Sequence, residues 1–297
     1  GDHIYIRQGR YTELLNKWQL NHSYETEGPK IVIEAYPNEE VIIDGTVALN
    51  DNSSNWVQDS LELDNGTTIN IYKTVINFDN ISREIMTPVD NITQVFVNGR
   101  YMIPAMPRNF KNPTDPTTGN PRNPEPGTVW ADWGRSPIRY PEDDNGSWGP
   151  SRKWYMPAQL ENLDFPEEWA FDSGNKTLYL YASDNYTPTS TNVRVRVRDR
   201  YLTFTHSDNI EFKNIHFFAG SFFFYNSSYI TFEDSKFSFN SDMGLRSNKA
   251  VYGTHMTVRN SIFEYINDGQ AWSTERSIYP TMENVLFRYN DWFMGSA

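Results

Sequence analysis

Three acidic residues near the end of this 297-residue chain recur at matching points of a repeated pattern. Asp242, Asp268 and Asp291 each follow an Asn within two residues, and each lies four or five residues after a Phe. Paired strands lie about 4.8 Å apart, so acids at matching points of neighbouring strands would be separated by about 5 or 10 Å. Carboxyl pairs about 5–5.5 Å apart serve retaining glycosidases, and pairs about 6.5–9.5 Å apart serve inverting ones. These acids are therefore the candidate catalytic residues.

The same acids also fit an ordinary structural role. Asn and Asp are strong turn formers, so all three could be turn residues. Crowded carboxylates raise one another's pKa, however, which would leave one of them available as a general acid. The pattern requires no cofactor and no metal site, although aligned acids with backbone oxygens could bind Ca²⁺.

Several residues near these acids suit contact with a substrate. They are Arg246, His255, Trp272 and Glu275. Trp272 could stack on a sugar ring or pack in the core, and His255 directly precedes a core strand. The sequence also fits a polysaccharide lyase, because β-elimination on a uronic acid needs a base and a cation that neutralises the carboxylate. The candidates for these two roles are Arg246, Lys249 and His255.

An eight-residue segment that occurs four times must position these residues. Each copy has apolar residues at its first and third positions, Asn or Asp at its fifth and Phe at its eighth. The copies are 210–217, 230–237, 256–263 and 280–287, with spacings of 20, 26 and 24 residues. Such a period with alternating apolar residues is typical of a β-solenoid. We expect the fifth positions to form an Asn/Asp ladder at a turn and the Phe residues to form an internal stack.

The rest of the chain divides into three segments. Residues 1–100 contain short apolar runs bounded by Gly, Pro and Asn, which predict N-terminal coils. Residues 101–160 form an insert with eleven of the 17 prolines. Its Trp133 and Arg135 suit the wall of a carbohydrate cleft, because aromatic faces stack on sugars and Arg binds carboxylate or sulfate. The alternative is a loop that packs its own Trp residues. Residues 161–297 return to coils after a hairpin expected at 168–181.

Alternating Val and Arg residues follow this hairpin. The alternation places the arginines on one face of a strand. They are Arg194, Arg196, Arg198 and Arg200. This face could be a solvated surface that discourages edge pairing or a stripe that binds anions.

Composition and charge exclude some classes of protein. The formal charge of −12 argues against nucleic acid as the main partner. The chain has no cysteine and no apolar run near the length of a membrane span. It opens abruptly at Gly1-Asp2-His3, so we expect a processed start and a secreted or periplasmic bacterial protein.

The aligned coils resemble the right-handed parallel β-helix of polysaccharide-active enzymes. The stretches 1–11 (GDHIYIRQGRY) and 33–45 are similar to the first coils of that family. The stretches 94–102, 169–172 and 178–181 resemble a subset in which glycoside hydrolases are found. The resemblance implies an all-β, right-handed parallel β-helix and a reaction on a carbohydrate. Hydrolases, lyases and epimerases share this fold, so the fold does not decide the reaction.

The sequence therefore predicts a glycoside hydrolase that cleaves an acidic or sulfated polysaccharide through two carboxylates on adjacent coils. A polysaccharide lyase and a non-catalytic carbohydrate-binding solenoid are the alternatives. The cap that precedes the Gly1-Asp2 strand in the family is missing, and the pattern still runs at Ala297. Since solenoids need capped ends, we expect a second chain or segment to complete the coils.

Overall fold

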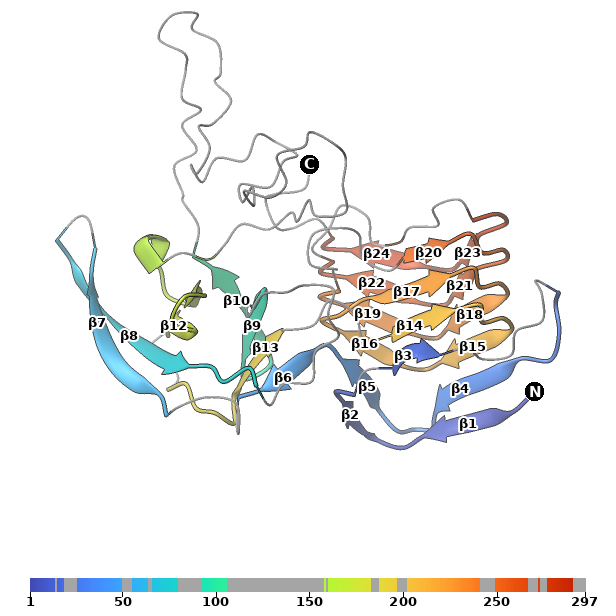
Figure 1. Cartoon of the computed structure of the whole chain (residues 1–297), viewed down its shortest axis with the longest axis horizontal. Coiled ribbons are helices and arrows are strands. Elements are labelled where there is room, and N and C mark those ends of the chain that lie inside the picture. Colours follow the sequence, from blue (N-terminus) through green and yellow to red (C-terminus); the bar gives the residue numbers. More distant parts are fainter. Residues whose placement is uncertain are drawn as a thin grey trace, which may run out of the picture. The chain divides into compact units, whose positions relative to one another are not determined.

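The computed structural model describes residues 1–13, 15–18, 26–49, 55–63, 66–79, 92–105, 158, 160–182, 187–196, 202–240, 249–266, 272 and 277–290. Within these ranges the elements are β-strands, apart from the one-turn 3-10 helix η2 (Leu160–Asn162) (Figure 1). The expectation of an all-β protein is therefore confirmed. None of the described segments forms a helix long and apolar enough to cross a membrane.

The chain forms two compact units. The first consists mainly of Gly1–Thr46 and Arg198–Met294, and the second mainly of Val47–Ser82 and Pro88–Val197. Each unit thus takes residues from both of the segments that were expected to form coils. Alternating apolar patterns are the same in parallel and antiparallel strands, so the sequence could not show which strands join which sheet.

Three parallel sheets build the first unit (Figure 1). Sheet A contains β1 (His3–Ile6), β4 (Ile31–Ala35), β15 (Ile210–Lys213), β18 (Ile230–Glu233), β21 (Thr257–Arg259) and β23 (Thr281–Glu283). Sheet B contains β2 (Gly9–Tyr11), β5 (Val41–Asp44), β16 (His216–Phe218), β19 (Lys236–Ser238), β22 (Ile262–Glu264) and β24 (Leu286–Arg288). Sheet C contains β3 (Leu15–Trp18), β14 (Leu202–Thr205), β17 (Phe222–Tyr225) and β20 (Lys249–Val251).

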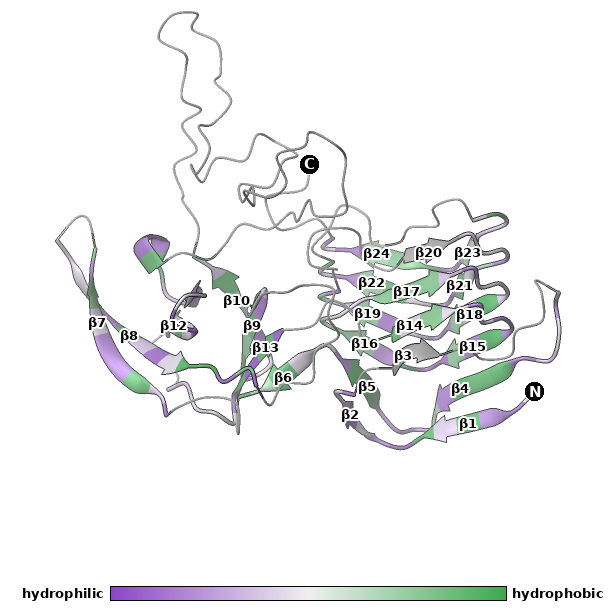
Figure 2. Ribbon diagram, viewed as in Figure 1, coloured by the Kyte–Doolittle hydropathy of each residue, from purple (hydrophilic) through white to green (hydrophobic). Residues whose placement is uncertain are grey.

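The chain passes through these sheets in a repeated order. From β14 to β22 it visits sheets C, A and B three times in succession. We call one such passage a layer. Equivalent residues of neighbouring layers lie side by side, as Phe212 pairs with Phe232 and Phe232 with Val258. This pairing confirms the alignment of the four repeated segments. Figure 2 shows how apolar the strands β4 and β17 are.

The predicted Phe stack is confirmed inside the first unit. The rings of Phe217 and Phe237 lie 5.0 Å apart, those of Phe237 and Phe263 4.4 Å, and those of Phe263 and Phe287 5.0 Å. The first three rings are buried, whereas Phe287 is 44% exposed. Stacked aromatic rings contribute both buried apolar area and ring–ring attraction, so the Phe stack is a main part of the core.

A ladder of turn residues joins sheets A and B. Asn214, Asp234, Asn260 and Asn284 all have left-handed backbone conformations, with φ between 49° and 53°. Asn is among the residues that tolerate this conformation best. The Asn284 amide donates a hydrogen bond of 2.9 Å to Oδ1 of Asn260 in the layer before it. The ladder expected from the sequence is therefore confirmed at this step.

A single mixed sheet builds most of the second unit. Its strands in order are β6 (Thr46–Ala48), β13 (Val193–Arg196), β9 (Gln94–Val97), β10 (Arg100–Pro104), β11 (Glu168–Asp172), β12 (Thr177–Tyr181), β8 (Thr68–Val75) and β7 (Val57–Glu62). The strands β11 and β12 form the predicted antiparallel hairpin. Arg196 is completely buried, so the arginine face of this strand is not a solvated surface at that position.

Candidate functional site

Most of the predicted site lies outside the described residues. This applies to Asp242, Asp268, Asp291, Arg246, Glu275, Arg135 and Trp133, and their roles stay predictions. Of the predicted substrate contacts, the structure describes His255 and Trp272.

These two residues make contacts with other aromatic rings. The Trp272 ring packs edge-on at 5.3 Å from Phe222 and at 6.0 Å from Phe263. Trp272 therefore contributes to the core of the first unit. The His255 ring is stacked 4.5 Å from Tyr229 and 4.9 Å from Tyr279, so it belongs to a column at the corner between sheets C and A.

Another aromatic column precedes the three candidate acids in the sequence. Phe239, Tyr265 and Tyr289 each follow a strand of sheet B directly, and their φ angles lie between 54° and 56°. The rings of Phe239 and Tyr265 are stacked at 4.9 Å, and those of Tyr265 and Tyr289 at 5.1 Å. We call these three residues the aromatic column. The chain thus leaves sheet B at matching positions in three successive layers.

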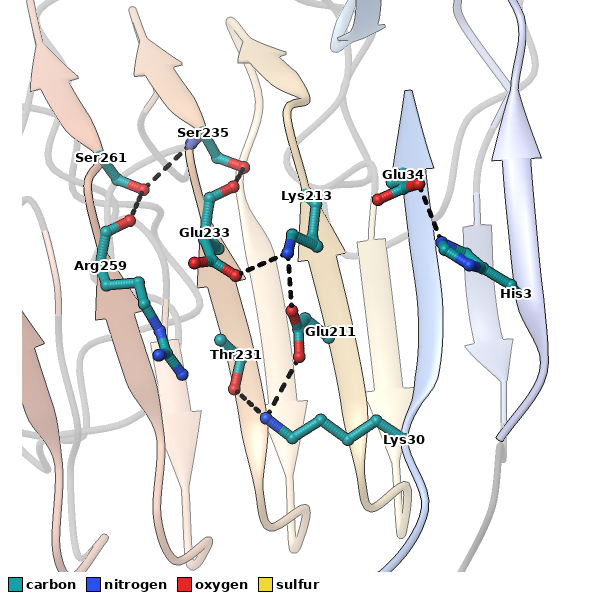
Figure 3. A network of polar contacts seen from close by, with 10 residues as sticks. All are labelled: His3, Lys30, Glu34, Glu211, Lys213, Thr231, Glu233, Ser235, Arg259 and Ser261. Atoms are coloured by element: carbon teal, nitrogen blue, oxygen red, sulfur yellow. Dashed lines mark hydrogen bonds and ion pairs between the residues drawn. The ribbon is translucent and has the colours of Figure 1, made fainter. Parts of the chain in front are cut away.

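The outer face of sheet A carries ion pairs between neighbouring strands (Figure 3). The Lys213 Nζ lies between two carboxylates, 2.9 Å from Glu233 and 3.4 Å from Glu211. Lys30 approaches Glu211 from its other side at 3.3 Å and donates a hydrogen bond of 3.0 Å to Thr231. The network brings two glutamates of adjacent strands together, which makes it a candidate for carboxylate chemistry.

The electrostatics of this network argue against catalysis. The hydrogen bond from Lys213 lowers the pKa of Glu233, and the same bond raises the pKa of Lys213. A general acid of a glycosidase instead needs a raised pKa, so that it keeps its proton near neutral pH. We therefore assign the network to cross-strand pairing that stabilises sheet A.

The outer face of sheet B holds two further carboxylates. Asp44 is completely buried and accepts a hydrogen bond from Arg10. The Glu264 carboxylate lies 2.6 Å from both Lys236 and Arg288. Burial raises the pKa of Glu264, but the hydrogen bonds from these two cations outweigh burial, and the pKa is lowered. Glu264 is thus held as an ion.

His216 lies between these ion pairs. It forms a short hydrogen bond with Ser238, and the ring is mostly buried. Burial lowers the pKa of His216 to about 4, and Lys236 and Arg10 add to the effect, while Glu264 and Asp44 oppose it. The imidazole is therefore neutral at pH 7.

We expect His216 to make the protein less stable in acid. The pKa is about 4 in the folded protein and about 6.5 in the unfolded chain, so the unfolded chain binds more protons between these values. Stability should fall by about 2–3 kcal/mol as the pH drops from 7 to 4, and only slightly further below that. Urea unfolding of wild type and His216→Gln at pH 7 and pH 4.5 measures this loss of stability, because the variant has no imidazole at this position to protonate.

His3→Gln is the matched control, since His3 is 43% exposed on sheet A. It should keep the acid sensitivity of wild type. Equal losses of stability for wild type and His216→Gln would contradict the assignment.

The residues of sheet B were missed by the sequence analysis. His216, Lys236, Glu264 and Arg288 flank the Phe of each repeat, one residue before or after it. These positions carry a different residue type in each copy of the repeat, so the pattern of shared residues does not mark them. Their one signal in the sequence is the polar or charged side chain next to the recurring Phe.

The described residues show no metal centre. Within the ranges that the structure describes, no three His, Asp or Glu side chains are grouped so that they could hold a metal ion. The Ca²⁺ alternative involved Asp242, Asp268 and Asp291, so it stays a prediction.

Comparisons with known proteins give a similarity of fold. No protein-family model and no curated protein sequence matches the chain. A solved structure named "Glycoside hydrolase" matches 89% of this chain and 66% of its own, with a TM-score of 0.51 and 12% identity. A structure described as XylC in complex with xylose matches 97% of this chain and 63% of its own, with a TM-score of 0.34 and 10% identity. The chain thus spans about two thirds of the length of either protein, and its fold is similar to that of the first.

Proposed function

We propose that this protein is a secreted or periplasmic glycoside hydrolase that cleaves an acidic or sulfated polysaccharide. We propose also that its first unit is a right-handed parallel β-helix. The parallel register of sheets A, B and C and their repeated order support this architecture. The fold similarity to a protein named glycoside hydrolase supports the class of reaction.

The register of the aromatic column carries the proposal. Its three rings stack in successive layers, and Asp242, Asp268 and Asp291 follow two or three residues later in the sequence. Because layers of a parallel sheet repeat at about 4.8 Å, acids that follow stacked positions are expected to lie close enough to act in pairs.

The reaction that we propose uses two of these carboxyl groups. One, in its protonated form, donates its proton to the glycosidic oxygen as the bond to the anomeric carbon breaks. The other either attacks that carbon and forms a glycosyl–enzyme bond, which water activated by the first carboxylate then hydrolyses, or removes a proton from the water that attacks it. Asp268 follows the middle ring of the column, Tyr265, in the sequence, so we assign it to the pair together with Asp242 or Asp291.

A polysaccharide lyase is the second candidate, and His216 favours it. This imidazole is neutral at pH 7 and lies among cations, with Lys236 and Arg10 both close enough to affect its pKa. A lyase needs such a base and a cation that neutralises the uronate carboxylate. The burial of His216 limits its access to a substrate.

One assay distinguishes the candidate functions. The protein is incubated with algal and plant polysaccharides, and reducing ends and the ultraviolet absorbance of unsaturated uronates are followed together. We expect new reducing ends without absorbance. Absorbance that rises with the reducing ends would establish the lyase, and neither signal on any polymer would leave a carbohydrate-binding protein.

A further inference from the structure

The outer face of sheet B separates its charges by depth. The carboxylates of Asp44 and Glu264 have side-chain exposures of 0% and 6%. The cations paired with them remain accessible, at 36% for Arg10, 42% for Lys236 and 44% for Arg288. A ligand that approaches this face therefore meets the positive groups first, although the chain as a whole carries a charge of −12.

Sheet A shows that this arrangement is not general in the first unit. Along one outer row of sheet A the register pairs Glu34, Lys213, Glu233, Arg259 and Glu283 in that order. Opposite charges thus alternate from strand to strand, and each neutralises its neighbours. Sheet A offers no comparable stripe of one sign, so it provides an internal control.

Aromatic rings accompany the cations of sheet B. The Arg10 guanidinium lies 5.1 Å from the centre of the Phe218 ring, and that of Arg288 lies 5.9 Å from the Tyr289 ring. Tyr289 is 61% exposed at one end of the aromatic column. Cations together with aromatic rings suit an acidic sugar, because its ring packs on an aromatic surface while its acid group binds the cation.

The cations have already used several of their hydrogen-bond donors. Arg288 donates through both Nε and Nη2 to Glu264, and Arg10 donates through Nη1 to Asp44. Lys236 is engaged with Glu264 as well. Arg has five N–H donors and Lys has three, so these ion pairs leave each cation further donors for the acid group of a ligand.

We propose that the outer face of sheet B binds a polysaccharide chain of uronic acid units, with their carboxylates on Arg10, Lys236 and Arg288 and a sugar ring against the exposed Tyr289. The inference rests on the proposed function, since the occupant is the class of polymer that the enzyme would cleave. The candidate catalytic acids follow the residues of the aromatic column closely in the sequence.

Affinity electrophoresis in gels that contain alginate tests this inference. Alginate consists of uronic acids and carries no sulfate. We expect alginate to retard the wild-type protein and Lys236→Met to weaken the apparent affinity about tenfold, as expected for one charge-assisted hydrogen bond. Met keeps most of the apolar stem of Lys, and Arg288 remains to neutralise Glu264.

Lys213→Met is the matched control. It removes the same charge from the outer face of sheet A, where Lys213 is 32% exposed and also paired with glutamates. It should bind alginate like wild type. Equal weakening by both substitutions would overturn the inference, as would no retardation by alginate or retardation by dextran sulfate alone.

Two further arms complete the test. Arg10→Gln is the second variant, for the case that Lys236→Met does not fold. Its fold should be kept, because the Asp44 carboxylate still accepts hydrogen bonds from Thr46. It too should bind alginate about tenfold more weakly.

The electrophoresis measures binding, so its result is independent of cleavage. Retardation by alginate, with no cleavage of any polymer in the assay above, would support this face and refute the hydrolase. New reducing ends on one of those polymers without retardation by alginate would do the reverse.

Discussion

Replacement of Asp268 by Asn is expected to lower turnover of the polysaccharide about 10²- to 10⁴-fold, the usual contribution of a general acid or base. The amide has nearly the shape of the carboxyl group, but it has no proton to donate at neutral pH and no negative charge. The fold should therefore be unchanged while the reaction becomes much slower. The initial rate at which reducing ends appear measures the effect, on whichever polymer the wild type cleaves.

Asp79→Asn is the control for this substitution. Asp79 is exposed in the second unit, and the change of charge is the same. The variant should cleave at the wild-type rate. Full activity of Asp268→Asn would refute the assignment of this residue, and a comparable loss in Asp79→Asn would show that the effect does not belong to the site.

Replacement of Phe237 by Ala is expected to cost about 3–5 kcal/mol in the free energy of unfolding. The ring is completely buried and stacks on both Phe217 and Phe263. Its removal takes away the apolar area and both ring contacts, and it leaves a cavity that stacked layers cannot easily close. Urea unfolding followed by circular dichroism measures the loss.

Phe287→Ala is a matched control from the same Phe stack. Phe287 stacks on Phe263 alone and is 44% exposed, so truncation should cost far less. Similar losses for Phe237→Ala and Phe287→Ala would contradict a core organised around the Phe stack.

The sequence predicted the repeated part of the fold well, because the repeat aligns residues that touch. Phe217, Phe237 and Phe263 share a position in the repeat and stack in the structure. The Asn260–Asn284 contact follows from the same alignment. These predictions held since equivalent residues of parallel strands lie in register.

The second unit could not be predicted in the same way. Its strands have no repeat, and their apolar alternation suits several partners. Arg196 is an example. The alternation predicts which face of its strand it lies on, but it does not predict that this position is buried in the folded protein. The repeat did not mark the cations of sheet B, such as Arg288, because the positions beside the Phe carry a different residue type in each copy.

The pairing of β4 with β15 has a consequence for how the chain folds. Lys30 and Glu211 are 181 residues apart in sequence, whereas contacts between the next two layers span 20 residues. Closing the longer loop costs about 2 kcal/mol more chain entropy than closing the shorter one. We therefore expect the layers from β14 onward to assemble first on one another, and the strands of residues 1–46 to join afterwards as the slow step of folding.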